Sequence, residues 1–122
     1  MVTALVIDDN TDTADSLCQL LSLMAVDAIP AYGPRAALVY LQREVPDFVL
    51  LDLNMPGVSG LEVLRYLRRE PRLVDVPVIV VTAEDERIVL QKTLRAGATA
   101  VITKPASFEQ LENILRNAKV IP

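Results

Sequence analysis

Short runs of apolar and β-branched residues alternate five times with segments of helical periodicity along this chain of 122 residues. This alternation is typical of βαβ units, in which each helix returns the chain to begin another parallel strand. The third and fourth runs are continuously apolar, as expected of central strands covered on both faces. The predicted strands span residues 4–8, 28–32, 48–52, 78–82 and 100–103. The sequence therefore predicts one α/β domain with a doubly wound, five-stranded parallel sheet and five helices.

The helices are marked by apolar periodicity and by capping residues. In the first helix, five apolar residues recur at steps of three and four and predict one buried stripe: Ala14, Leu17, Leu21, Met24 and Ala25. Other boundaries are predicted from capping boxes of Ser59 with Glu62 and of Ser107 with Gln110, from Pro34 at the start of the second helix, and from Gly97 after a fourth helix at residues 85–96.

The composition excludes several kinds of protein. The absence of histidine argues against His-based zinc sites and catalytic triads. A net charge of −4 argues against a dedicated nucleic-acid binder, which needs a basic face. The single cysteine, Cys18, is predicted to be a small core residue. No apolar stretch approaches the roughly 20 residues that cross a bilayer, and no leader precedes the first strand, so we expect a cytoplasmic domain.

Polar side chains that can carry chemistry end or follow four of the five predicted strands. Asp8 and Asp9 belong to the first strand end, Asp52 to the third, Thr82 to the fourth and Lys104 to the fifth. In a doubly wound sheet, ligands bind outside the carboxyl ends of the strands. The second strand ends without a charged group, which suits an outer position in the strand order 2-1-3-4-5. We therefore expect these side chains to meet at one edge of the sheet.

The convergence of three carboxylates predicts a cation site. At ~4 Å and an effective dielectric constant near ~20, each pair of carboxylates repels by on the order of 4 kcal/mol. The available ligands are oxygens (Asp9, Asp52, a backbone carbonyl and water), which suits Mg²⁺, and Mn²⁺ could substitute. A carboxylate beside such an ion can act as a nucleophile toward phosphorus, with Lys104 and the Thr82 hydroxyl neutralising the phosphoryl oxygens.

Four short motifs occupy these strand ends: VIDDN (residues 6–10), LLDLNMPG (50–57), VTA (81–83) and TKP (103–105). In this order and at this spacing they resemble the motifs of two-component response-regulator receiver domains, and the resemblance spans essentially the whole chain. It implies a flavodoxin-like fold in which residues 1–122 form one receiver domain without an output domain.

The resemblance implies a role for each site residue. Asp52 is the implied phosphoacceptor. The groups implied to bind the phosphoryl group are Lys104, the Thr82 hydroxyl and the Ala83 N–H. The implied magnesium ligands are Asp9, Asp52 and the backbone carbonyl of Asn54, with Asp8 acting mainly through water. A cis peptide bond between Lys104 and Pro105 is implied as well.

The resemblance also implies partners. The phosphoryl donor would be the phosphohistidine of a sensor histidine kinase or of a histidine phosphotransfer protein. The new charge on Asp52 would change a surface that an unidentified downstream protein reads, so turnover is self-modification rather than substrate catalysis. We expect a monomer or weak dimer with no nucleic-acid or membrane partner. The chain stops soon after the fifth predicted helix, so we expect a stand-alone receiver or a relay or sink receiver cut from a longer regulator or hybrid kinase.

Two features bear on how such a switch would work. Many receivers carry Tyr or Phe three residues before the site lysine, where this chain has Val101. A valine cannot alternate between a buried and an exposed ring, so we expect the coupling of Thr82 to the surface of the fourth helix and fifth strand to differ. Asn54 and Glu84 resemble the corresponding pair in the chemotaxis response regulator, which predicts rapid loss of the phosphoryl group.

Other interpretations of the same residues remain open at the level of sequence. An aspartate-nucleophile phosphatase of the haloacid dehalogenase type uses similar groups. In that family the motif that holds the nucleophile comes first along the chain, whereas here Asp8 and Asp9 come first. A flavodoxin-like cofactor binder would need glycines at residues 8–13, which hold three acids instead. Asp8 and Asp9 could be helix caps, Thr82 the cap of the fourth helix, and Lys104 a solvated lysine. Four arginines are interpreted as a solvated helix face: Arg65, Arg68, Arg69 and Arg72.

Overall fold

The computed structural model describes residues 1–122, apart from the side chain of Glu86. Its strands are β1 (Thr3–Ile7), β2 (Asp27–Ala31), β3 (Phe48–Leu51), β4 (Val78–Thr82) and β5 (Ala100–Thr103). They form one parallel sheet in the order β2-β1-β3-β4-β5, as predicted. The helices are α1 (Thr11–Ser22), α2 (Pro34–Leu41), α3 (Gly60–Arg69), α4 (Glu86–Arg95) and α5 (Phe108–Asn117).

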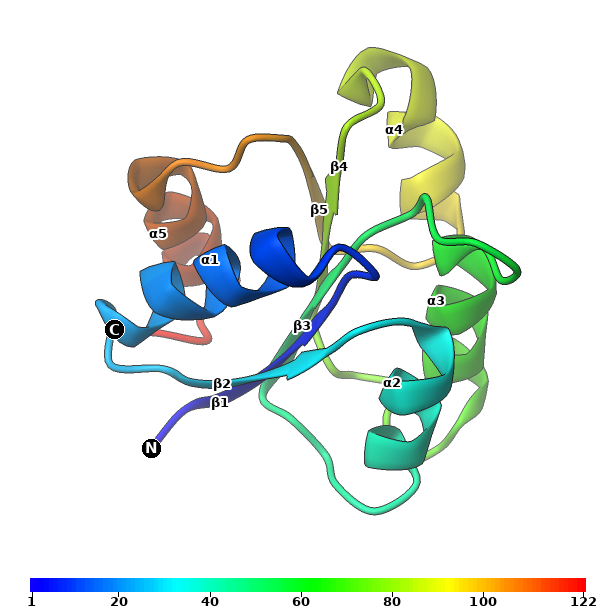
Figure 1. Ribbon diagram of the computed structural model, residues 1–122, viewed down its shortest axis with the longest axis horizontal. Coiled ribbons are helices and arrows are strands. Elements are labelled where there is room, and N and C mark those ends of the chain that lie inside the picture. Colours follow the sequence, from blue (N-terminus) through cyan, green and yellow to red (C-terminus); the bar gives the residue numbers. More distant parts are fainter.

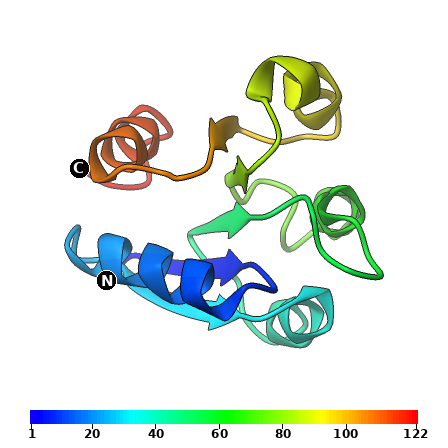
Figure 2. The same cartoon turned by 45° about the horizontal axis from the view of Figure 1, so that its top comes forward.

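The helices cover both faces of the sheet. α1 and α5 pack on one face, and α2, α3 and α4 pack on the other, as Figures 1 and 2 show from two directions. Right-handed crossovers produce this arrangement when a chain winds outward in both directions from a central strand. No described helix combines the length and the apolar character that crossing a bilayer requires.

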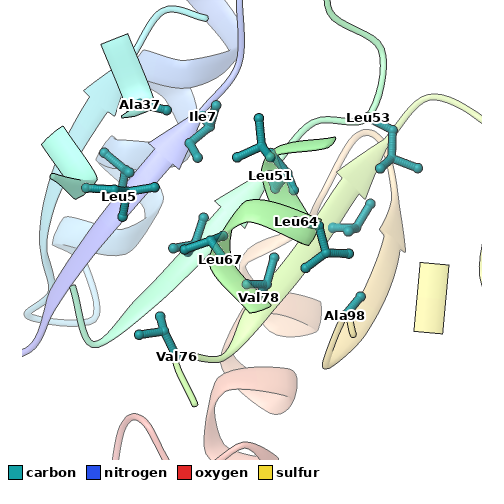
Figure 3. Packing of buried hydrophobic residues seen from close by; sticks show 14 of the residues in the cluster. Leu5, Ile7, Ala37, Leu51, Leu53, Leu64, Leu67, Val76, Val78 and Ala98 are labelled. Atoms are coloured by element: carbon teal, nitrogen blue, oxygen red, sulfur yellow. The ribbon is translucent and has the colours of Figure 1, made fainter. Parts of the chain in front are cut away.

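A separate hydrophobic cluster fills the space on each side of the sheet. Every residue of β3 and β4 is buried, because these strands supply side chains to both clusters. On one face, Leu64 and Leu67 of α3 pack over Leu51 and Val78 (Figure 3). The other face is filled by a cluster that contains Phe48 and buried leucines of α1 and α5. Each such buried side chain contributes roughly 1.5–3 kcal/mol, so the sheet is held most firmly at its centre.

β1, β2 and β3 each end one residue before the predicted end. Asp8 and Asp52, predicted as the last residues of their strands, instead lie just outside the sheet. Their backbone N–H groups still donate to neighbouring strands, that of Asp8 to the Ala31 carbonyl (3.1 Å) and that of Asp52 to the Ile7 carbonyl (2.9 Å). The backbones therefore stay tied to the sheet while the two residues lie beyond its carboxyl edge.

The predicted helix starts are correct in part. The reciprocal capping box of Ser107 and Gln110 is present at the start of α5. Ser59 caps α3, but its hydroxyl accepts from the Leu61 N–H (3.2 Å), so the predicted box with Glu62 is wrong. Two neighbouring N–H groups are free at the start of a helix, and sequence spacing alone does not tell which of them the Ser59 hydroxyl accepts from.

α1 buries three of the five residues of its predicted stripe: Ala14, Leu17 and Leu21. The helix ends at Ser22, so Met24 is half-buried and Ala25 is exposed in the following turn. Ala25 has a φ of 60°, and its N–H donates to the Ser22 carbonyl (3.1 Å). The stripe prediction fails at its end because the helix stops at Ser22 and the chain then turns through the left-handed Ala25.

Two arginines predicted to lie on a solvated helix face bind backbone carbonyls instead. Arg68 donates from Nε to the Gly97 carbonyl (2.9 Å) and from Nη1 to the Val74 carbonyl (3.2 Å). Arg72 donates from Nη2 to the carbonyl of Leu41, the last residue of α2 (2.7 Å). Partial burial lowers the pKa of the Arg68 guanidinium. The other two arginines are exposed, as predicted.

Cys18 packs against the core cluster on the α1 and α5 face, as predicted, although it is only half-buried. Burial, with a smaller contribution from the charge of Asp15, raises the pKa of the thiol to about 11. The thiol is therefore protonated at neutral pH and behaves as a small apolar group.

Ala25→Gly is expected to stabilise the fold. A residue with a side chain loses about 1 kcal/mol in the left-handed conformation that glycine does not lose. Because Ala25 is exposed, removing its methyl group gives up little packing. Urea unfolding should give a free energy of unfolding about 1 kcal/mol above that of the wild type. Ala96→Gly is the matched control and should bring no gain, because Ala96 ends α4 with a φ of −75°. Unchanged or lowered stability of Ala25→Gly would contradict this interpretation.

Candidate functional site

The sheet register brings the ends of neighbouring strands to one edge. Ile7 pairs with Leu51 across β1 and β3, so the aspartates that follow these two residues come side by side. Thr82 pairs with Thr103 across β4 and β5, and the Lys104 N–H donates to the Thr82 carbonyl (2.7 Å). The residues predicted to carry chemistry therefore lie at the carboxyl ends of adjacent strands, where open α/β sheets bind ligands.

Asp8, Asp9 and Asp52 form an acidic cluster in which one carboxylate oxygen of each lies within 4.8 Å of the others. Asp8 and Asp52 are 1% and 5% exposed, whereas Asp9 is exposed. Like charges at this spacing oppose one another unless a cation or a proton intervenes. All three groups offer oxygen ligands, which small, hard divalent cations prefer. The acidic cluster could therefore hold a metal ion, and its donor set fits Mg²⁺.

Lys104 reaches the acidic cluster from the end of β5. Its Nζ donates to Asp8 Oδ2 at 2.8 Å and lies 3.6 Å from Asp52 Oδ1. Lys104 is thus not a freely solvated lysine. The preference for Asp8 was not predicted, since the sequence does not tell which neighbouring carboxylate the ammonium approaches more closely. The peptide bond from Lys104 to Pro105 is cis, as the family resemblance implied.

Backbone N–H groups hold the two buried carboxylates in place. The Asn10 N–H donates to Asp8 Oδ1 (3.0 Å), and the Asn54 N–H lies 3.3 Å from Asp52 Oδ1. Such bonds between an aspartate and the backbone two residues on fix the carboxylate relative to its own turn. The N-cap of α1 is Asn10, whose side chain accepts from the Thr13 N–H (3.0 Å), so the interpretation of the preceding aspartates as caps is wrong.

Gly60 lies against the backbone of the loop between β3 and α3 (residues 52–59), here called the Asp52 loop. Its N–H donates to the Leu53 carbonyl (2.9 Å). A Cβ at this position would lie 2.7 Å from Leu53 Cα and would also meet the Asp52 carbonyl oxygen. Only glycine lets α3 begin so close to this loop. A glycine in the first turn of a helical pattern, where it is a poor helix former, was the available signal.

Thr82 is fully buried at the end of β4, and its Oγ1 accepts from the Glu84 N–H (3.2 Å). The hydroxyl keeps its own proton for another acceptor. Ala83 is exposed in the loop that follows. α4 is capped by Asp85, whose carboxylate accepts from the Arg87 N–H (2.9 Å). The interpretation of Thr82 as the cap of this helix is therefore wrong.

Desolvation raises the pKa of the Asp52 carboxyl above its ordinary value of 3.8. The Lys104 ammonium and the Asn54 N–H stabilise the charged form and oppose this rise, whereas the charges of Asp8 and Asp9 add to it. The net direction is upward, because burial and two like charges outweigh one ammonium at 3.6 Å. The surroundings of the Asp52 carboxylate thus favour an additional positive charge close to it.

Asp52→Asn is expected to stabilise the protein when divalent cations are absent. Well below pH 3.8, the ordinary aspartate pKa, Asp52 is protonated in the folded and unfolded states alike, so its ionisation has no effect. As the pH rises through 3.8, the unfolded state ionises first, and the wild type loses stability until the raised folded-state pKa is passed. The advantage of Asp52→Asn should therefore grow with pH and become constant above that pKa.

Urea unfolding across this pH range, with a chelator present, measures the difference. Asp27→Asn removes an exposed carboxylate on β2 and is the control for the loss of one negative charge. A stability difference between wild type and Asp52→Asn that does not change with pH would contradict the electrostatic description of the acidic cluster.

Comparisons with known proteins extend over most of the chain. A family model described as the response regulator receiver domain matches residues 4–116. The phosphate regulon transcriptional regulatory protein PhoB of Pseudomonas aeruginosa is 33% identical over 109 residues. The sensory transduction protein RegX3 of Mycobacterium tuberculosis is 39% identical over 111 residues. These alignments cover 89% and 91% of this chain but 48% of each relative, so the chain spans about half the length of the curated relatives it matches.

Solved structures show the same architecture. The chemotaxis protein CheY4 of Vibrio cholerae superposes with a TM-score of 0.89 at 25% identity, covering 97% of this chain and 98% of that one. The bacteriophytochrome response regulator AtBRR has a TM-score of 0.85 at 27% identity, covering 100% of this chain and 95% of its own. The family match runs from β1 into α5 and includes the acidic cluster and Lys104. This chain is therefore a receiver domain of the two-component response-regulator family.

Proposed function

We propose that this receiver domain is a cytoplasmic phosphoacceptor switch in which Asp52 takes a phosphoryl group from the phosphohistidine of a sensor histidine kinase or a histidine phosphotransfer protein. The observation that carries the proposal is a nearly buried carboxylate, 5% exposed, which lies 3.6 Å from an ammonium and beside two further carboxylates. The raised pKa of Asp52 and its position at the sheet edge support this role, because they are typical of a carboxylate whose charge is neutralised by a bound cation as well as by the protein.

The acidic cluster would hold the cation that this chemistry needs. We assign Asp9, Asp52 and the backbone carbonyl of Asn54 as direct ligands of Mg²⁺, with Asp8 acting mainly through water; Mn²⁺ could substitute. The donor set supports this assignment, because it consists of oxygens on carboxylates that otherwise repel one another. When bound, such an ion supplies charge neutralisation for a phosphoryl group and for the attacking carboxylate.

In the transfer step, a lone pair of an Asp52 carboxylate oxygen forms a bond to phosphorus as the phosphorus–nitrogen bond of the phosphohistidine breaks. The electron pair of the broken bond stays on the imidazole nitrogen of the donor. Lys104, the Thr82 hydroxyl and the Ala83 N–H are proposed to bind the phosphoryl oxygens. The positions of the buried Thr82 and the half-buried Lys104 at the ends of β4 and β5 support this assignment. In-line positioning and charge neutralisation are the main requirements of phosphoryl transfer.

The outcome of phosphorylation is proposed to be a changed protein surface rather than the release of a converted substrate. Val101 is half-buried in β5, faces Val80 in the register and packs against the core cluster of the α2 to α4 face. It offers no aromatic ring to move between buried and exposed positions, so the downstream protein is proposed to read another surface. A relay or sink role in a longer protein is the alternative, in line with relatives about twice the length of this chain.

Incubation with acetyl phosphate and Mg²⁺ should add the mass of one phosphoryl group to the wild type, as intact-mass spectrometry would show. Asp52→Asn should add none, because the amide lacks the nucleophilic oxygen. Lys104→Met should slow the addition by on the order of ten- to a hundred-fold, since it removes a positive group from the developing charge. Asp27→Asn lies at the first residue of β2, at the opposite end of the strands from the acidic cluster, and is the control, which should react as the wild type does.

An adduct that persists in Asp52→Asn would contradict the assignment of the acceptor. Repeated release of phosphate from varied phosphate esters, without a stoichiometric adduct, would favour the aspartate-nucleophile phosphatase instead. Asn54 and Glu84 are proposed to favour rapid loss of the phosphoryl group, and an adduct that survives for hours at neutral pH after removal of acetyl phosphate would contradict this.

A further inference from the structure

α3 begins on the backbone of the Asp52 loop. The Gly60 N–H donates to the Leu53 carbonyl (2.9 Å), and the space where a Cβ would stand is taken by backbone atoms of Asp52 and Leu53. Contacts between two backbones leave no flexible side chain to absorb a small shift. A displacement of the loop therefore displaces the first turn of α3.

The last turn of α3 is tied to the turn that follows α4. Arg68 donates through Nε to the Gly97 carbonyl (2.9 Å) and through Nη1 to the Val74 carbonyl (3.2 Å). Gly97 has a φ of 108°, and a Cβ there would lie 2.8 Å from Arg68 Cγ. The absence of a side chain at Gly97 thus lets the arginine lie directly on the turn. A planar guanidinium that binds two carbonyls fixes the orientation of both.

Between these two ends, α3 is held as a stiff body. Its buried side chains Val63, Leu64 and Leu67 are at most 2% exposed, and Leu64 and Leu67 pack against the sheet in Figure 3. A helix of 10 residues is about 15 Å long and has little internal freedom when one face is packed. A shift at its first turn therefore reaches its last turn.

Few of the described side chains of α4 are buried against the rest of the molecule. Among its described side chains, Val89 and Thr93 are the buried ones, and the Thr93 hydroxyl bonds within the helix to the Val89 carbonyl (2.6 Å). Ile88 and Leu94 are 76% and 41% exposed. With so little burial, the position of α4 depends on its two connections, one of which is the turn that Arg68 binds.

We propose that α3 couples Asp52 to the C-terminal end of α4, with Arg68 as the residue that transmits the change to the turn at Gly97. The coupling rests on the proposed function, because phosphorylation of Asp52 is the change that it carries. It needs no residue of β5, so it can operate with valine at position 101. Arg68 touches neither the acidic cluster nor Lys104 and acts only on the response.

The test is hydrogen exchange, followed by mass spectrometry, in peptides covering residues 93–99 with and without excess acetyl phosphate and Mg²⁺. Wild type should change its exchange rate in this segment upon phosphorylation. Arg68→Met keeps the apolar length of the side chain but removes its donors, so the phosphorylation-dependent change should shrink at least roughly two-fold. Arg69→Met is the matched control on the same helix, since Arg69 is exposed and makes no side-chain hydrogen bond among the described residues. It should respond as the wild type does.

Intact mass, measured on the same samples, separates the two proposals. An adduct on both proteins with an equal exchange response in wild type and Arg68→Met would overturn the coupling and leave the proposed function standing. The absence of any adduct on the wild type would overturn the proposed function, and the coupling with it. A merely structural arginine would raise the basal exchange but leave the phosphorylation-dependent change intact. If Arg68→Met loses its folded circular dichroism spectrum, Arg68→Leu, which also lacks donors, replaces it, and a full response there would overturn the coupling.

Discussion

The central electrostatic constraint in this structure is the repulsion among the carboxylates of Asp8, Asp9 and Asp52 at one edge of the sheet. Parallel pairing of β1 with β3 forces Asp8 and Asp52 together, and both are nearly buried. In the described structure, the Lys104 ammonium is the positive group within ion-pair distance of them. The apolar clusters on both faces of the sheet fix the strand register and so maintain the repulsion. The fold thereby gives up stability at this edge and gains a group of carboxylates that could hold a metal ion.

Much of the fold followed from local pattern. Alternating strand and helix segments, apolar central strands and the charged strand ends predicted the sheet order and the side chains that meet at its edge, because in parallel sheets these features translate directly into position. Contacts between elements distant in sequence were not predictable in this way. Arg68 and Arg72 look like a solvated stripe until α3 is placed beside the ends of α4 and α2. The close approach of Gly60 to the Asp52 loop and the preference of Lys104 for Asp8 likewise depend on distances that only the folded structure shows.

The proposed coupling does not depend on an aromatic ring at position 101, where this chain has a valine. The backbone of the Asp52 loop contacts the first turn of α3 at Gly60. α3 is packed along one face and tied by Arg68 to the turn after α4, whose buried side chains among those described are Val89 and Thr93. A rigid element between a charged loop and a lightly held helix can carry a response without a rotating aromatic ring.

The most direct measurement is a carbon-13 NMR titration of the Asp52 carboxyl group, first with a chelator and then with Mg²⁺. Burial of the carboxyl group, reinforced by the charges of Asp8 and Asp9, predicts a pKa above 3.8 without divalent cations and a marked fall when Mg²⁺ is added, because the ion stabilises the charged form. A carboxyl that titrates at or below 3.8 in the chelator, or that ignores Mg²⁺, would contradict the account of the acidic cluster.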